Sequence, residues 1–118
     1  MTGKASNRKG YRFMRDITDW LNAYGHPHAT IRSKGQSGSD VLETPGICWE
    51  LKAVQKTSLG AWVDQATQDA SREGADIAVV VHKRRQVADP AAQFATLTLE
   101  TFNQLLLEAG YGNGETTT

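Results

Sequence analysis

The sequence has no apolar run long enough to cross a membrane, and its basic N-terminus lacks the apolar segment of a signal peptide. Its single cysteine, Cys48, excludes an internal disulfide and falls far short of a zinc-binding set. Basic and acidic side chains balance at 13 each, so the overall positive charge typical of nucleic-acid-binding domains is also missing. These absences predict a cytoplasmic protein with no membrane partner, and 118 residues suit one compact domain.

The distribution of charge is less even than its total. Residues 1–35 carry seven basic and two acidic side chains, whereas residues 36–118 carry six basic and eleven acidic ones. A second basic cluster is formed by Lys83, Arg84 and Arg85. Such asymmetry is compatible with a phosphate-binding face on a neutral molecule, although composition alone explains it equally well as charge that keeps the protein soluble.

Hydrophobic periodicity predicts a single α/β domain over residues 8–111, between a flexible N-terminus (1–7) and a disordered tail (112–118). The expected helices cover 8–24, 59–73 and 100–110, and glycines end the first two. The expected strands cover 28–33, 40–43, 47–54, 75–83 and 94–99, with a Gly/Ser-rich loop at 34–40 that ends at Asp40. The order α-β-β-β-α-β-β-α predicts a central mixed sheet flanked by helices.

The strand at 47–54 is apolar except for two charged residues. Because side chains alternate across a strand, Ile47, Trp49, Leu51 and Ala53 should share one face, and Cys48, Glu50, Lys52 and Val54 the other. A hairpin with the preceding strand would bring Asp40 next to Glu50. Two carboxylates with a backbone carbonyl, which we assign to Leu51, and water molecules form a set of oxygen ligands suited to Mg²⁺.

In such a site Lys52 would bind the scissile phosphate or help to activate the attacking water. Each charge also needs the others, because an unpaired buried carboxylate or ammonium is costly. The alternative is that Glu50 and Lys52 form a solvated pair on an edge strand. An E-x-K triplet alone is common; its position after a Gly-rich loop, an acid and a turn makes the metal site the more specific interpretation.

Four segments together resemble a known family: "KGYRFMRDITDWLNAYG", "GSDV", "CWELKA" and "AWVDQA". They are similar to the PD-(D/E)XK nuclease superfamily and, more closely, to the Holliday junction resolvases of archaea and of actinobacterial phages, from Lys9 to Tyr111. The resemblance implies a restriction-endonuclease-like core, with Asp40, Glu50 and Lys52 on the family motif. It also implies that Gln65 is a polar active-site residue.

By the same resemblance, the protein would be a homodimeric endonuclease that uses Mg²⁺, with Mn²⁺ as a substitute. It would nick symmetric strands of four-way DNA junctions during DNA recombination, in the cytoplasm of a phage-infected bacterium.

One position departs from the family pattern. The family carries a glutamate four residues after the glycine of the Lys-Gly pair, and this sequence has Met14 there. Asp16 is a poor stand-in, and either Asp16 or Asp19 would serve only if the helix were rotated. A weakened metal site or a non-catalytic DNA-binding relative therefore stays open, as does a nuclease acting on flaps or mismatched duplex.

Phosphate contacts are expected from basic and hydroxyl side chains near the site, with a solvated helix face as the alternative for the first helix. These are Arg8, Lys9, Arg12, Arg32, Lys34, Ser37, Ser39, Lys83, Arg84 and Arg85. The three tryptophans are expected in the core or a dimer interface rather than stacked on bases. His82 is expected to be a hydrogen-bonded histidine at a strand end, and Cys48 a buried, unreactive filler.

Overall fold

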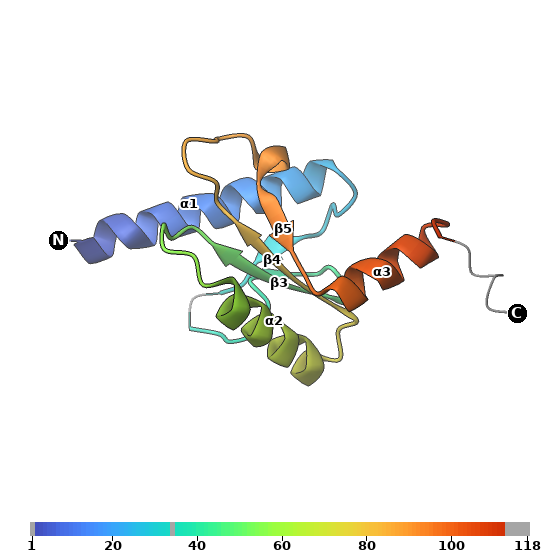
Figure 1. Ribbon diagram of the computed structural model, residues 1–118. Helices are drawn as coiled ribbons and strands as arrows, with labels where there is room; N and C mark the ends of the chain where they lie inside the picture. The colour runs from blue at the N-terminus through green and yellow to red at the C-terminus, as the bar shows by residue number, and fades with distance from the viewer. Residues whose placement is uncertain (1, 34, 113–118) are drawn as a thin grey trace, which may run out of the picture.

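The computed structural model describes residues 2–33 and 35–112, with side chains described from residue 8 onward. The order of helices and strands along the chain is the predicted one (Figure 1). The elements are α1 (Thr2–Ala23), β1 (Thr30–Ile31), β2 (Val41–Leu42), β3 (Ile47–Lys52), α2 (Leu59–Glu73), β4 (Ile77–His82), a 3₁₀ turn (Pro90–Ala92), β5 (Phe94–Thr96) and α3 (Leu99–Glu108). The α/β class is therefore confirmed.

A β-α-β unit forms the centre of the molecule. Strand β3 pairs in parallel with β4, and α2 makes the crossover between them, so the carboxyl ends of both strands lie at the same edge. Strand β5 pairs antiparallel with β4, which completes a mixed sheet in the order β3-β4-β5. The register places Glu50 opposite Val80 and Lys52 opposite His82.

The prediction that β2 and β3 pair as a hairpin is wrong. Strand β2 pairs with β1 in a separate two-stranded sheet. Along the edge of β3, side chains occupy the places of ladder acceptors: the Trp49 N–H donates to Ser39 Oγ (2.9 Å) and the Leu51 N–H donates to Asp40 Oδ2 (2.7 Å). The Asp40 N–H still donates to the Trp49 carbonyl (2.8 Å), so the two segments are adjacent without forming a regular ladder.

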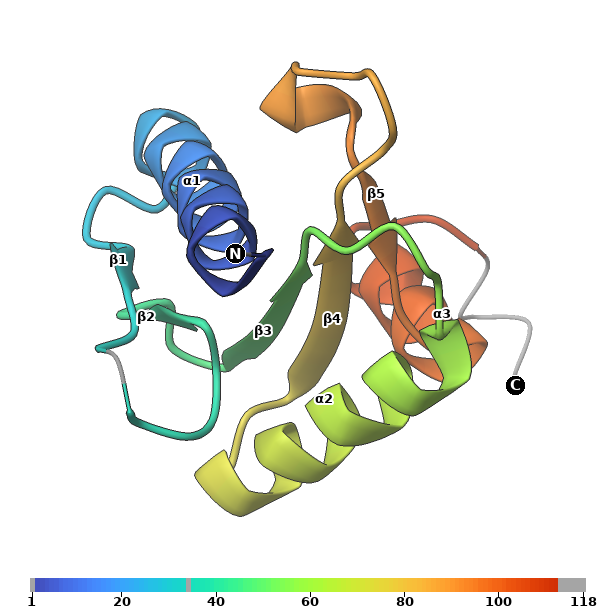
Figure 2. The ribbon, with the colours of Figure 1, turned by 90° about the vertical axis from the view of Figure 1, so that its left-hand side faces the viewer.

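Helices α1 and α2 cover opposite faces of β3 and β4 (Figure 2). On the α1 face, one core cluster joins side chains from the helix, both sheets and a loop: Phe13, Ile17, Leu21, Ala29, Val41, Leu51 and Val81. On the α2 face, Ala66 and Ala70 are buried, as are Cys48 and Val80 on the strands. Trp49 and Ala53 pack beside Leu51 on the α1 face, as the period of a strand predicts.

Several boundaries differ from expectation, each with a local cause. Helix α1 begins at Thr2 instead of residue 8: residues 2–7 contain no proline, and extending a helix that is already packed further along needs no new nucleation. Strand β5 ends at Thr96, because Thr98 caps α3: its Oγ1 accepts the Thr101 N–H at 3.1 Å. Helix α2 has the predicted bounds, and Gly74 ends it in the left-handed region (φ +72°). The expected tail lies outside the described residues apart from Gly112.

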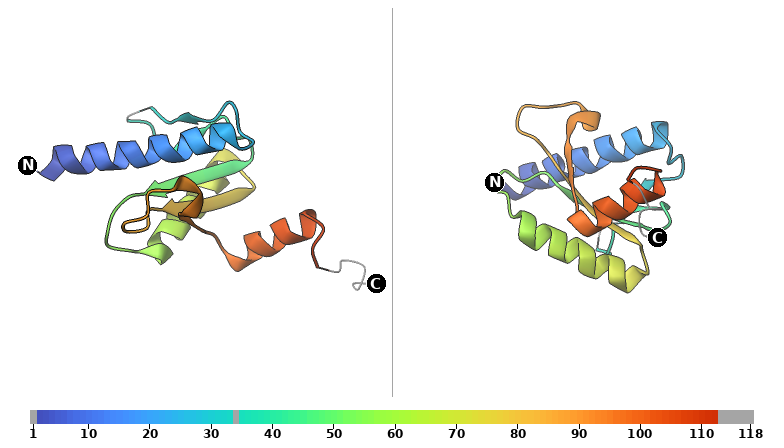
Figure 3. Two further views of the ribbon diagram at one scale, coloured as in Figure 1. Left: turned by 90° about the horizontal axis from the view of Figure 1, so that it is seen from above. Right: turned by 45° about the vertical axis from the view of Figure 1, so that its right-hand side comes forward.

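Helix α3 projects from the body of the molecule, at the opposite end from the start of α1 (Figure 3). None of its residues is buried, and Leu99 is 80% and Phe102 48% exposed. In the part of the chain that the structure describes, no helix combines the length and the apolar character needed to cross a membrane.

Candidate active site and basic cleft

Asp40 is buried (5% exposed) and is held from three directions. Its Oδ1 accepts a hydrogen bond from Arg32 Nη2 at 2.7 Å, its Oδ2 accepts the Leu51 N–H at 2.7 Å, and its own N–H binds the Trp49 carbonyl. Charge-assisted bonds of this kind fix a carboxylate in one position. Asp40 is therefore fixed against the edge of β3 by its own side chain.

Glu50 lies beside Asp40 on the α2 face, as predicted. The pKa of the Glu50 carboxyl is raised from 4.5 to about 7. Burial is the largest cause of this shift, and the neighbouring negative charge of Asp40 is the second. Lys52 Nζ, 3.8 Å from Glu50 Oε1, lowers the pKa but does not outweigh these two effects. Asp40, Glu50 and Lys52 thus lie close together at β3. A further positive charge there would reduce the repulsion between the two carboxylates.

The residues present fit a magnesium ion. A carboxylate oxygen has two acceptor sites, and each Asp40 oxygen uses one for the contacts above. The Leu51 N–H points away from β4 toward Asp40, and the carbonyl of an extended residue leaves the strand on the same side as its N–H. Asp40, Glu50 and the Leu51 carbonyl offer the all-oxygen set that Mg²⁺ prefers, with water for the remaining positions.

In the part of the chain that the structure describes, no third acid completes this set. Among the described residues, no three His, Cys, Asp or Glu side chains are grouped so that they could hold a metal ion. Met14, which stands where the resemblance places a glutamate, packs against the core cluster on the α1 face. Asp16 and Asp19 are exposed on α1, so neither substitutes for that glutamate.

Asp69 is a buried acid that the sequence interpretation missed. It is 6% exposed on α2, and its negative charge raises the pKa of both Glu50 and Cys48. Gln65, predicted at the site, is exposed one turn earlier and its Nε2 donates to Asp69 Oδ1 at 3.1 Å. Asp69 follows Ala66 by three residues and so lies on the same, buried face of the helix. This spacing could have indicated from the sequence that Asp69 is buried.

The loop before Asp40 is tied to the end of α2. The Ser39 N–H donates to Glu73 Oε2 at 2.8 Å, and Gly38 (φ +99°) lies so close to Glu73 that a Cβ atom there would collide with the same carboxylate. Ser39 is buried, and its hydroxyl donates to the Val41 carbonyl (2.7 Å) while it accepts the Trp49 N–H. The expectation that Ser39 contacts a phosphate is therefore wrong: its hydroxyl is used within the fold.

The other loop residues have separate outcomes. Arg32 is paired with Asp40 and also donates to the Gln36 carbonyl, so its charge serves Asp40 rather than an open surface. Ser37 is exposed on the loop, and Lys34 lies outside the described residues. Arg8 and Arg12 are exposed on α1.

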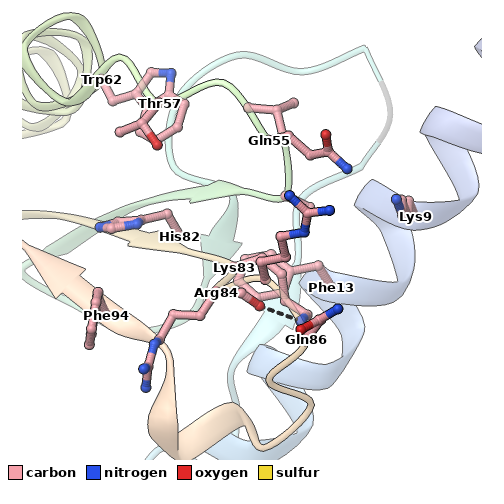
Figure 4. A pocket seen from close by; sticks show the side chains of 13 residues that line it. Lys9, Phe13, Gln55, Thr57, Trp62, His82, Lys83, Arg84, Gln86 and Phe94 are labelled. Carbon is pink, nitrogen blue, oxygen red and sulfur yellow. Dashed lines mark hydrogen bonds between the residues drawn. The ribbon is translucent and has the colours of Figure 1, made fainter.

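A cleft of about 610 Å³ opens where β3 and β4 end (Figure 4). We call it the basic cleft; it is lined by Lys9, Phe13, Ala53, Val54, Gln55, Thr57, Trp62, His82, Lys83, Arg84, Arg85, Gln86 and Phe94. It gathers Lys9 from α1 and the 83–85 cluster, which the sequence predicted separately as phosphate-binding residues. The carboxyl ends of parallel strands are the usual place for a ligand site in α/β sheets.

The basic side chains of the cleft are not equivalent. Lys83 Nζ donates to the carbonyls of Arg84 (2.8 Å) and Val87, and Arg84 Nη1 donates to the Ala92 carbonyl (3.1 Å). These two residues thus partly fasten the loop after β4. Lys9 and Arg85 are exposed, and within the described part of the chain they make no ion pair or side-chain hydrogen bond.

Lys52 and Trp62 connect the acids with the basic cleft. Lys52 Nζ lies 5.9 Å from the ring centre of Trp62, which lines the cleft from α2. Next to Trp62, His82 Nε2 is hydrogen-bonded to Thr96 Oγ1 (2.8 Å), and burial lowers the pKa of the imidazole, which fits the expected bonded histidine. Cys48 is buried, and burial raises the pKa of its thiol to about 12, so it is the inert filler expected.

Comparisons with protein-family models, with curated proteins and with solved structures find no match to this chain.

Proposed function

We propose that the protein is a Mg²⁺-dependent endonuclease that acts on branched DNA, with four-way junctions as its substrate. The observation that carries this proposal is the meeting of Asp40, Glu50 and Lys52 beside the basic cleft. A pair of carboxylates with an adjacent ammonium costs folding free energy at this buried place, and phosphodiester hydrolysis is a reason to keep it. The resemblance of the surrounding segments to the PD-(D/E)XK nucleases supports the same function.

Bound Mg²⁺ would stabilise the negative charge that develops on the phosphate and lower the pKa of a water molecule. Asp40, Glu50 and the Leu51 carbonyl would hold the ion. Lys52 would place its ammonium against the scissile phosphate, and Arg32 would hold the Asp40 carboxylate in position. The basic side chains of the cleft would bind the DNA backbone without reading its sequence.

Binding should depend on salt, because each neutralised phosphate releases counterions. Four basic residues line the cleft: Lys9, Lys83, Arg84 and Arg85. Four such contacts give a slope of log affinity against log salt concentration of about −3 to −4. A shallower slope would argue against the cleft as the backbone-binding surface.

The decisive experiment is nicking of an end-labelled four-way junction with Mg²⁺ or Mn²⁺, and with EDTA in parallel. Glu50→Gln keeps the size of the side chain and removes its charge, and should reduce nicking by at least about 100-fold, since a metal ligand is worth several kcal/mol in the transition state. Asp64→Asn, an exposed position on α2, is the matched control and should nick like wild type. Full activity in EDTA, or in Glu50→Gln, would refute the metal-dependent site.

A homodimer is part of this proposal, and α3 supports it. A helix of 10 residues that buries none of its side chains is marginal in water, yet α3 presents exposed apolar side chains, among them Leu99, Phe102 and Leu107. A second copy of the chain is the partner that a symmetric two-strand cut requires. Phe102→Asp should shift the mass measured by light scattering toward the monomer, whereas Asn103→Asp, with the same added charge, should not. A monomeric wild type would contradict this part.

Met14 favours a second candidate, a non-catalytic DNA-binding protein with the same fold. Its place in the core leaves the site without a further acid in the described chain. Tight junction binding without metal-dependent nicking would select this candidate. Competition of the junction with flaps and mismatched duplex would show whether another branched DNA is the true substrate. A role in phage DNA recombination, in the host cytoplasm, rests on the family resemblance.

A further inference from the structure

Phe94 is an aromatic side chain exposed within the basic cleft. It opens β5 opposite His82, and 53% of its surface is exposed. The Arg84 guanidinium lies 4.3 Å from its ring centre, and the His82 ring meets it edge to face at 6.1 Å. Two neighbours thus hold the ring in one orientation, while about half of it stays open to a ligand.

The lining of the cleft has one sign of charge. Among the described residues that line it, four are basic and none is acidic. Lys9 lies across the cleft from Trp62, His82 and Phe94 (Figure 4), and both Lys9 and Arg85 are free to bind an anion within the described structure. A ligand that matches this lining has a flat apolar part for the aromatic side and a negative part for the basic side.

We propose that the basic cleft binds an unpaired nucleotide of a DNA strand, with its base stacked on Phe94 and its phosphates held by Arg85 and Lys9. A paired base hides both faces in the duplex, so only an unpaired or displaced base exposes a face for stacking. The volume of about 610 Å³ lies within the range of small-ligand sites. Sequence would not be read, since every base has such a face.

This inference rests on the proposed function and narrows its substrate class. Trp62 lines the cleft and contacts Lys52, which is 3.8 Å from Glu50. A base in the cleft would therefore lie near the acids, and its strand would be led toward them. Branched DNA with an unpaired nucleotide close to the cut is the substrate that this arrangement favours over an uninterrupted duplex.

The test is binding without cleavage, measured in EDTA by fluorescence anisotropy of a labelled thymidine oligonucleotide and of a labelled blunt duplex. Phe94→Leu keeps an apolar side chain and removes the aromatic face. It should weaken binding of the single strand by about 5- to 150-fold, because stacking of one base is worth roughly 1–3 kcal/mol, and change duplex binding by less than about 2-fold. Phe94→Trp should retain the affinity, which separates stacking from a folding defect.

Two controls complete the experiment. Tyr24→Leu removes an exposed aromatic ring outside the cleft and should leave both affinities unchanged. Arg85→Ala and Lys9→Ala should weaken both ligands and each make the salt slope shallower by about 1, whereas Arg15→Ala, on another face of α1, should not.

The inference is overturned if Phe94→Leu binds the single strand like wild type, or loses duplex and single strand equally. It is also overturned if free thymidine monophosphate competes as well as the unlabelled oligonucleotide when both are expressed as concentration of nucleotide. The cleft would then bind single nucleotides and not a DNA strand. This binding test does not measure cutting, so it can be judged separately from the nuclease. If binding depends on Phe94 but the protein never nicks DNA, the nuclease is refuted and the nucleotide site stands. If the protein nicks DNA but Phe94 has no effect on binding, the nuclease stands and the nucleotide site is refuted.

Discussion

The two faces of strand β3 differ sharply in polarity. Toward α1, Leu51 joins the core cluster and Trp49 packs against it. Toward α2, Glu50 and Lys52 bring two charges into the same layer, and the pKa of Glu50 records the cost. Adjacent residues of one strand thus have opposite effects on stability: those on one face stabilise the fold, and those on the other face destabilise it. A protein retains such a face when its charges have another use.

Truncation of the apolar face should give the largest change in stability. Leu51→Ala removes a buried side chain of the core cluster and should lower the free energy of unfolding by about 2–5 kcal/mol. Val54→Ala, at an exposed position beyond the same strand, should cost less than about 0.5 kcal/mol. Urea denaturation measures both, and similar losses would mean that the two positions are not packed as described.

Neutralisation of the charged face should have the opposite sign. Because the pKa of Glu50 rises from 4.5 to about 7 on folding, the native state holds this proton more tightly than the unfolded state. Stability therefore falls as pH rises from 4.5 to 7, and the full penalty is present above pH 7. Glu50→Gln, neutral at every pH, should be about 1–3 kcal/mol more stable than wild type at pH 8 in EDTA.

The difference between Glu50→Gln and wild type should shrink toward zero as the pH falls below 4.5, where the glutamic acid of both states becomes largely protonated. Asp64→Asn, which alters an exposed acid of α2, should show no such trend. A constant difference from pH 4.5 to 8 would mean that Glu50 is solvated, and the contrast between the two faces would be lost.

The smallest effect concerns the contact between Lys52 and Trp62, which joins the charged face to the cleft. A double-mutant cycle with Lys52→Met and Trp62→Leu should give a coupling energy of about 0.5–1 kcal/mol, typical of a cation near an aromatic ring. Thermal unfolding of the four proteins measures this coupling. A value near zero would separate the acids from the cleft energetically.

The sequence was sufficient where local signals agreed. Helix α2 has an apolar periodicity and a glycine that permits its left-handed end, so both of its bounds were predicted. The alternation of β3 followed from the period of a strand. Asp40 does approach Glu50, but through its own bonds to β3 and not through the hairpin on which that prediction relied. Local pattern and tertiary packing favour the same structure in these segments.

The remaining features depend on contacts that no local pattern contains. The hairpin was expected because adjacent strands usually pair. Instead, the backbone N–H groups at this edge of β3 donate to the Ser39 hydroxyl and the Asp40 carboxylate. Arg32 was assigned to phosphate because its charge is visible in the sequence, whereas its partner across the loop is not. Asp69 was missed because an acid on a helix is normally solvated, and only the packing of α2 on the sheet buries it.

Gly38 and Glu73 occupy one small space, and this has an evolutionary consequence. At φ +99° any side chain at position 38 would strain the backbone, and its Cβ atom would push aside the end of the flexible Glu73 side chain, which accepts the Ser39 N–H. Related chains should therefore retain glycine at position 38. Since the next residues of this loop are Ser39 and Asp40, a related chain with another residue at position 38 should hold the Asp40 carboxylate in a different place.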